Sequence, residues 1–74
     1  MTNAELKDAL MNESPVVWRS PVYGEIRYKC VHAIRYMRGK NGSINILAEL
    51  MDHNNNSITT VNVREVFFDD EEEN

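Results

Sequence analysis

Cys30 and His32 are the residues of this chain whose types and spacing come nearest to chemistry. They lie two positions apart, which suits two ligands of a metal ion or a thiol with a neighbouring base. A closed zinc site needs four ligands, however, and besides carboxylates the chain offers only His53. A thiol nucleophile needs its base in hydrogen-bond contact, whereas side chains on one strand face stand about 7 Å apart. We therefore expect no metal site and interpret Cys30 as a buried structural thiol.

Other catalytic signatures give no stronger signal. The sequence contains no glycine-rich phosphate loop, no nucleophile elbow and no paired carboxylates in a structured stretch. A chain of 74 residues also has little volume for a closed active site. We predict that the protein is not an enzyme, has no catalytic residue and uses no cofactor.

Basic residues are concentrated in one stretch of the chain. Six of the eight fall between positions 19 and 40, where Glu25 alone opposes them. Aromatic residues are interleaved with them, a combination with which small barrels bind nucleic acid through phosphates and stacked bases. The plainer interpretation is a solvated strand face that discourages aggregation. The candidate binding residues are Arg19, Tyr23, Arg27, Lys29, Arg35 and Arg38.

An acidic run, residues 69–73, follows the last apolar residues of the chain. It has three interpretations: a solubilising appendage, an internal competitor for the basic stretch, or a mimic of nucleic-acid charge that engages a basic partner. The first is the default for a terminal charge run. We expect residues 1–68 to form a single compact domain and residues 69–74 to form a disordered acidic tail.

The elements that must position these residues follow from local patterns. Thr2 and Glu5 have the spacing of a capping box, and Pro15 stops any helix before it, which predicts a short helix over residues 3–12. Alternation from Glu25 to Met37 predicts one long bent strand, with its even positions buried and its odd positions partly basic. Further strands are expected at 44–51 and 57–61, with tight turns at 40–43, 52–56 and 62–66.

This order of elements predicts a mostly β fold with one short N-terminal helix. The small SH3-like barrel suits it best, and the alternative is a curved antiparallel meander with the helix packed on one face. Leu47 and Met51 fall on the outer face of their strand, where the helix or a second copy must cover them. Because so small a core is marginal and Cys30 is the single cysteine, we also predict a homodimer.

The chain has no apolar run of the roughly 20 residues that a membrane span needs. Its first residues lack the basic start and apolar stretch of a signal peptide, and its cysteine is unpaired. We expect no membrane association and a cytoplasmic location.

One ordered set of short stretches marks turns and core positions over about residues 4–66. The stretches are Glu5-Leu6, Pro15-Val16-Val17, Ile26-Arg27-Tyr28, Ala33-Ile34-Arg35-Tyr36, Ala48-Glu49-Leu50-Met51-Asp52 and Ser57-Ile58-Thr59. This order resembles that of very short, uncharacterised proteins encoded by phages and prophage-like elements of Gram-positive gut bacteria, although the 19–24 loop is longer here. The resemblance brings no catalytic or binding residue. It implies a compact β-rich accessory protein that works by binding in the cytoplasm of a bacterial host.

Two hypotheses from different classes follow. The first is a phage or mobile-element accessory protein that binds a host or phage protein stoichiometrically, including inhibition of a host defence factor. The alternative is a nucleic-acid-binding module that uses the basic strand from Arg27 to Arg35. The salt dependence of binding separates them, because phosphate contacts weaken steeply with salt.

Overall fold

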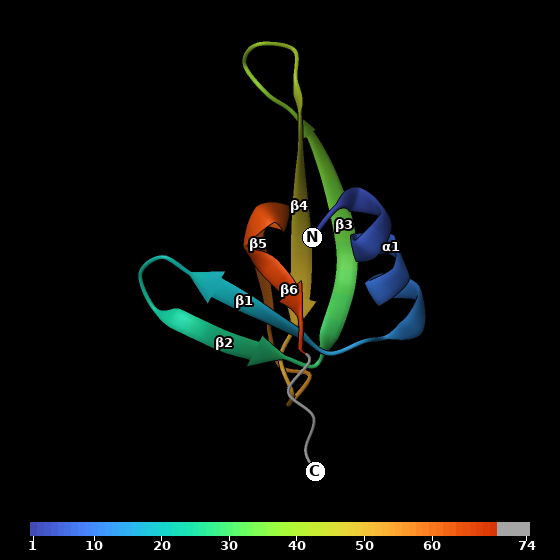
Figure 1. The fold of residues 1–74 in the computed structure, drawn as a ribbon, viewed down its shortest axis with the longest axis vertical. Helices are drawn as coiled ribbons and strands as arrows, with labels where there is room; N and C mark the ends of the chain where they lie inside the picture. The colour runs from blue at the N-terminus through green and yellow to red at the C-terminus, as the bar shows by residue number, and fades with distance from the viewer. Residues whose placement is uncertain (70–74) are drawn as a thin grey trace.

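A computed structural model describes residues 1–69, which fold into two three-stranded antiparallel sheets and one α-helix (Figure 1). The first sheet has the order β2-β1-β6 and the second the order β3-β4-β5. The elements are α1 (Asn3–Asn12), β1 (Val16–Ser20), β2 (Gly24–Tyr28), β3 (Cys30–Arg38), β4 (Ile44–Met51), β5 (Ile58–Asn62), the 3-10 turn η1 (Val63–Glu65) and β6 (Val66–Phe68). The predicted mostly β class with one short N-terminal helix is confirmed.

Helix α1 begins and ends as its sequence predicts. The Thr2 hydroxyl accepts the Glu5 N–H at 3.1 Å, and the Thr2 N–H donates to the Glu5 carboxylate at 2.8 Å, which completes the capping box. The helix ends at Asn12, and the capping residue Glu13 adopts a left-handed conformation with φ of 54°. Leu6 and Ala9 are fully buried, and the helix packs against β3.

The predicted strand over residues 25–37 is bent so sharply that it serves both sheets. β2 pairs with β1 in the first sheet, and β3 pairs with β4 in the second, with Lys29 as the single residue between them. A β-bulge then shifts the register between Val31 and Ala33. Bulges bend a strand and increase its twist, so the chain curves around a small core instead of running past it.

This bend breaks the predicted alternation between Tyr28 and the bulge, whereas Ile34, beyond the bulge, packs against the core as predicted. In β2 the even positions face inward as expected, because Ile26 is half-buried and Tyr28 is buried. After Lys29 the inward position moves by one residue, so that Val31 is buried and His32 is exposed. The prediction that Cys30 is buried is therefore wrong, since its side chain is only partly buried.

One hydrophobic core joins the helix to both sheets. Its fully buried members include Leu6 from α1, Val16 and Val66 from the first sheet, and Leu50 from the second. Leu47 and Met51 lie outside this core and are half-buried on the opposite face of the second sheet. The helix is therefore not their cover, and the homodimer remains a prediction. The predicted acidic tail at 69–74 lies outside the described residues except for Asp69, which donates its N–H to the Pro15 carbonyl at 3.1 Å.

Candidate partner-binding surface

Two hairpins project from the body of the molecule (Figure 1), and both carry exposed large apolar side chains. The β1–β2 hairpin ends in a turn at residues 21–23, called here the hairpin tip, where Val22 is 78% exposed and Tyr23 is 74% exposed. The β3–β4 hairpin projects along the long axis, and its outer part, residues 36–46, is called here the hairpin arm. Its exposed apolar side chains are Tyr36, Met37 and Ile44. Such exposed groups favour contact with another molecule.

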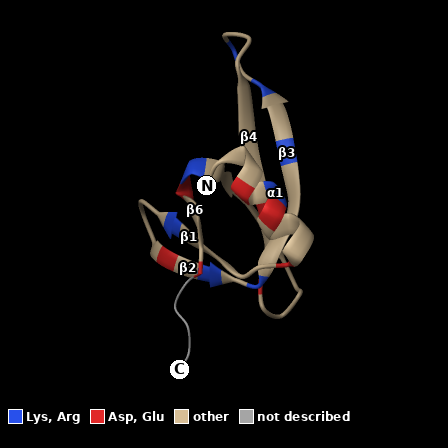
Figure 2. Cartoon of the chain, turned by 45° about the vertical axis from the view of Figure 1, so that its right-hand side comes forward, with Lys and Arg blue, Asp and Glu red and all other residues tan. Residues whose placement is uncertain are grey.

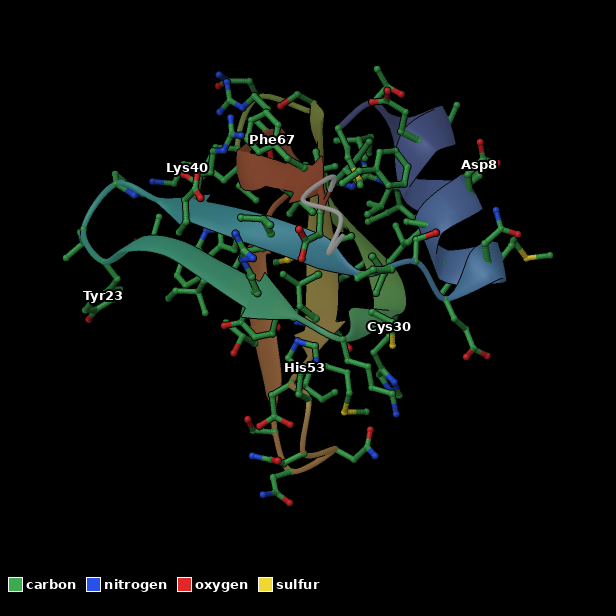
Figure 3. All side chains as sticks on the ribbon, turned by 60° about the horizontal axis from the view of Figure 1, so that its bottom comes forward. Asp8, Tyr23, Cys30, Lys40, His53 and Phe67 are labelled. Atoms are coloured by element: carbon green, nitrogen blue, oxygen red, sulfur yellow. The ribbon has the colours of Figure 1, made fainter. Side chains whose placement is uncertain are left out.

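The hairpin tip is held in one geometry by Ser20. This side chain is buried, and its Oγ accepts the N–H of Val22 at 3.1 Å and the N–H of Tyr23 at 2.9 Å. Gly24 closes the turn at φ of 84°, a region that favours glycine. Figure 3 shows Tyr23 at the end of the hairpin, pointing away from the body of the molecule. A tyrosine on an ordered turn loses little conformational entropy when a partner binds it.

Arg19 is part of the outer surface of the first sheet. Its Nε lies 3.2 Å from the Glu25 carboxylate across the β1–β2 pair, and its guanidinium lies over the Phe67 ring, 4.1 Å from the centroid. A cation above an aromatic face is attracted by the ring quadrupole. These contacts orient Arg19 along the sheet.

The other predicted basic residues are divided between the two sheets. Arg27 lies on β2, whereas Arg35 and Arg38 lie on β3. Lys29, at the junction, donates from Nζ to the Asn55 side chain at 2.9 Å. Arg35 is balanced by Glu49, with 3.5 Å between Nε and the carboxylate. The residues that the sequence places on one strand face therefore do not form one continuous surface.

The basic residues of the hairpin arm have fewer acidic neighbours than Arg19 and Arg35 have. The sequence has no acidic residue between Glu25 and Glu49, so the arm carries Arg38 and Lys40 without an acid of its own. In Figure 2 the charged residues on the outer part of this hairpin are all basic (blue), whereas acidic residues (red) lie on α1, on β2 and near η1. At the inner end of the arm, the Tyr36 hydroxyl donates to the Asn3 side chain at 2.9 Å, which ties the arm to α1.

An open groove of about 310 Å³ runs beside the arm. It is lined by Ile44, Asn45, Ile46, Asn62, Val63 and Arg64. The sequence does not reveal this groove, because its two walls, β4 and η1, are separated along the chain and meet only where β5 ends. The basic Arg64 within the predicted turn at 62–66 is the one sequence signal that could have pointed to it.

The residues that suggested metal or thiol chemistry are not gathered into a site. Within residues 1–69, no group of three or more His, Cys, Asp and Glu side chains could hold a metal ion. Cys30 lies on β3, and His53 lies in the turn between β4 and β5 (Figure 3). In that turn, Asp52 accepts the Asn56 N–H at 2.8 Å and the Ser57 hydroxyl at 3.1 Å. The Asn56 hydrogen bond in particular lowers the pKa of Asp52, as expected of a carboxylate that holds a turn.

Comparison with known proteins identifies no relative from which the role of this surface could be inferred. No family model, curated protein or solved structure matches the chain. Among residues 1–69, no helix is both long enough and apolar enough to cross a membrane.

Proposed function

We propose that this protein is a non-enzymatic accessory factor of phage or mobile-element type, which binds a host protein stoichiometrically in the bacterial cytoplasm and inhibits it, with a host defence factor as the target class. One observation carries the protein-binding part of the proposal, and the phage or mobile-element type rests on the resemblance of the sequence. Val22 and Tyr23 are about three-quarters exposed, yet their backbone is fixed by the buried Ser20 hydroxyl. Burial of an exposed apolar turn by a partner is favourable. Because this turn is already ordered, it loses little conformational entropy on binding.

The size of the gain suits a contact surface. Full burial of one large apolar side chain is worth roughly 1.5–3 kcal/mol, and tyrosines are enriched among the residues that dominate interface energies. Tyr23 therefore supplies the anchor, and Val22 extends it. We also propose an SH3-like barrel as the scaffold. The support is the continuous passage from β2 to β3 between the two sheets and the 3-10 turn η1 before β6.

Reconstitution of the complex tests the proposed function. The tagged protein captures its partner from host lysate, and the two purified proteins are then mixed and measured by light scattering. We expect a complex with one fixed ratio of subunits and a partner that is chemically unchanged. The protein alone is expected to give twice its chain mass of 8.6 kDa, as the predicted homodimer requires. A captured protein that is cleaved or modified, or a mass that grows without a fixed ratio, would contradict stoichiometric inhibition.

Nucleic acid is the second candidate partner, and the hairpin arm is the observation that favours it. Arg38 and Lys40 lie on the same hairpin as the half-exposed Tyr36, and cations together with aromatic groups bind single strands. Retention on immobilised DNA or RNA tests this. Binding through several phosphates falls steeply between low and physiological salt, whereas binding through an apolar anchor changes little.

A further inference from the structure

The outer part of β4 is open on the side of the groove. β5 pairs with β4 from Met51↔Ile58 to Leu47↔Asn62, and the chain then turns away into η1. In the part of the chain that the structure describes, no strand pairs with β4 on that side beyond Leu47. The groove has β4 residues on one wall and residues 62–64 on the other, so it lies where β5 would continue. This leaves room for one more short extended segment.

The backbone of Ile44 is turned toward this open side. Gly39 donates its N–H to the Ser43 carbonyl at 2.7 Å, so these two residues form a hydrogen-bonded pair of the hairpin. Antiparallel ladders alternate, and the next pair, Arg38↔Ile44, therefore exchanges no hydrogen bonds. The N–H and C=O of Ile44 point away from β3, toward the groove. Such groups on a strand edge are a template for another extended chain.

Charge around the edge selects an acidic segment. Arg38 is the cross-strand neighbour of Ile44, Lys40 lies in the adjoining turn, and Arg64 lines the groove. Asn62 positions Arg64, because its side-chain oxygen accepts the Arg64 N–H at 2.9 Å and Nε at 3.5 Å. Asn62 is neutral, so its contact does not cancel the charge of that guanidinium. An acidic chain laid along this edge is attracted electrostatically by these cations.

We propose that the outer edge of β4 receives an extended acidic segment of the partner protein, which adds to the sheet at Ile44. Backbone hydrogen bonds to Ile44 give affinity, and an apolar side chain of the segment packs on Ile44 and Ile46. Carboxylates of the segment then meet Arg38 and Arg64. This rests on the proposed function, since it names a second contact with the same protein partner. The apolar groove wall and the open backbone edge favour a peptide over nucleic acid.

A synthetic peptide tests the edge directly. The probe has the sequence of residues 66–74 of this chain, VFFDDEEEN, which combines apolar and acidic residues, and its control replaces each acid by the corresponding amide. Each peptide is titrated into the isotope-labelled full chain and followed through backbone amide resonances. We expect the acidic peptide to shift the amides of residues 44–46 and 62–64. The neutral peptide should bind about tenfold more weakly, a difference of about 1.4 kcal/mol.

Three variants separate the edge from general charge attraction. Ile44→Pro removes the outward N–H of a residue that exchanges no hydrogen bond with β3, and it should abolish the peptide-induced shifts. Arg38→Glu with Arg64→Glu should weaken binding about tenfold or more. Lys7→Glu, on the exposed side of α1, is the matched control and should leave binding unchanged.

Several outcomes would overturn the proposal. These are shifts centred on residues 20–24 or α1, equal binding of the neutral peptide, or full binding by the Ile44→Pro variant. Stronger shifts of the same amides by a single-stranded oligothymidine would assign the edge to nucleic acid instead. Failure here leaves the proposed function standing, because its test measures the ratio and chemical state of a captured protein and not peptide binding at β4.

Discussion

Two small polar side chains, Ser20 and Asp52, each hold a turn by accepting backbone N–H groups. Ser20 does so for Val22 and Tyr23 at the hairpin tip, and Asp52 does so for Asn56 between β4 and β5. Side chains of this type compete with regular structure for backbone donors and therefore favour turns. The composition of residues 52–56 predicts the turn that Asp52 holds, but the sequence does not show that Ser20 is buried beneath the hairpin tip.

Replacing Ser20 tests its part in the hairpin tip. Ser20→Ala leaves two backbone N–H groups of the turn without their acceptor, and we expect the free energy of unfolding to fall by about 1 kcal/mol. Urea unfolding measures the change, with Ser43→Ala in the exposed turn of the other hairpin as the control. Equal midpoints for Ser20→Ala and the unaltered protein would show that the tip does not depend on this hydroxyl.

The lowered pKa of Asp52 predicts that part of the free energy of unfolding is lost at acid pH. The Asn56 N–H, the largest cause, favours the ionised carboxylate in the folded protein. Its contribution is complete above the pKa of an unfolded aspartate, about 4, and is lost as pH falls through the lower pKa of the folded state. Asp52→Asn keeps an acceptor oxygen but cannot titrate.

The difference in unfolding free energy between Asp52→Asn and the unaltered protein should therefore shrink as pH falls from about 6 to about 2. Urea midpoints measured across this range give the difference. A gap that stays constant across the acid range would show that Asp52 is not stabilised in its ionised form.

At the scale of elements, periodicity predicts which segments form strands better than it predicts how one strand turns into the next. The alternation from Glu25 identifies β2 and β3, and the capping box identifies α1. The same alternation assigns Cys30 to the core because a period of two assumes an unbroken ladder. The change of sheet at Lys29 and the bulge after Val31 break that ladder. The length of the alternating stretch predicts a bend, but no residue in it marks where the bend and the bulge fall.

The groove beside β4 could not be predicted from local sequence patterns either. Its walls meet because β5 ends at Asn62 while β4 reaches back to Ile44. That difference in strand length is a property of the sheet and not of any one segment. Tyr23 and Arg38 could be named from the sequence as exposed candidates, whereas Ile44 and Arg64 needed the paired strands.

At the scale of the whole molecule, the core is too small to reach the ends of its hairpins. The chain extends 45 Å along its longest axis and 22 Å along its shortest, and the buried cluster lies where α1 and the two sheets meet. Apolar residues beyond that point stay exposed, including Tyr23 at one hairpin and Ile44 at the other. Two contact points in different directions suit a protein that acts by covering part of a larger partner.

The affinity of Tyr23→Ala for the captured partner tests the central proposal most directly. Calorimetric titration compares this variant with Met11→Ala, which removes an apolar side chain of α1 that is 79% exposed. We expect Tyr23→Ala to bind at least about tenfold more weakly, a loss of about 1.4 kcal/mol, and Met11→Ala to bind like the unaltered protein. Equal affinity of Tyr23→Ala and the unaltered protein would contradict a contact made through the hairpin tip.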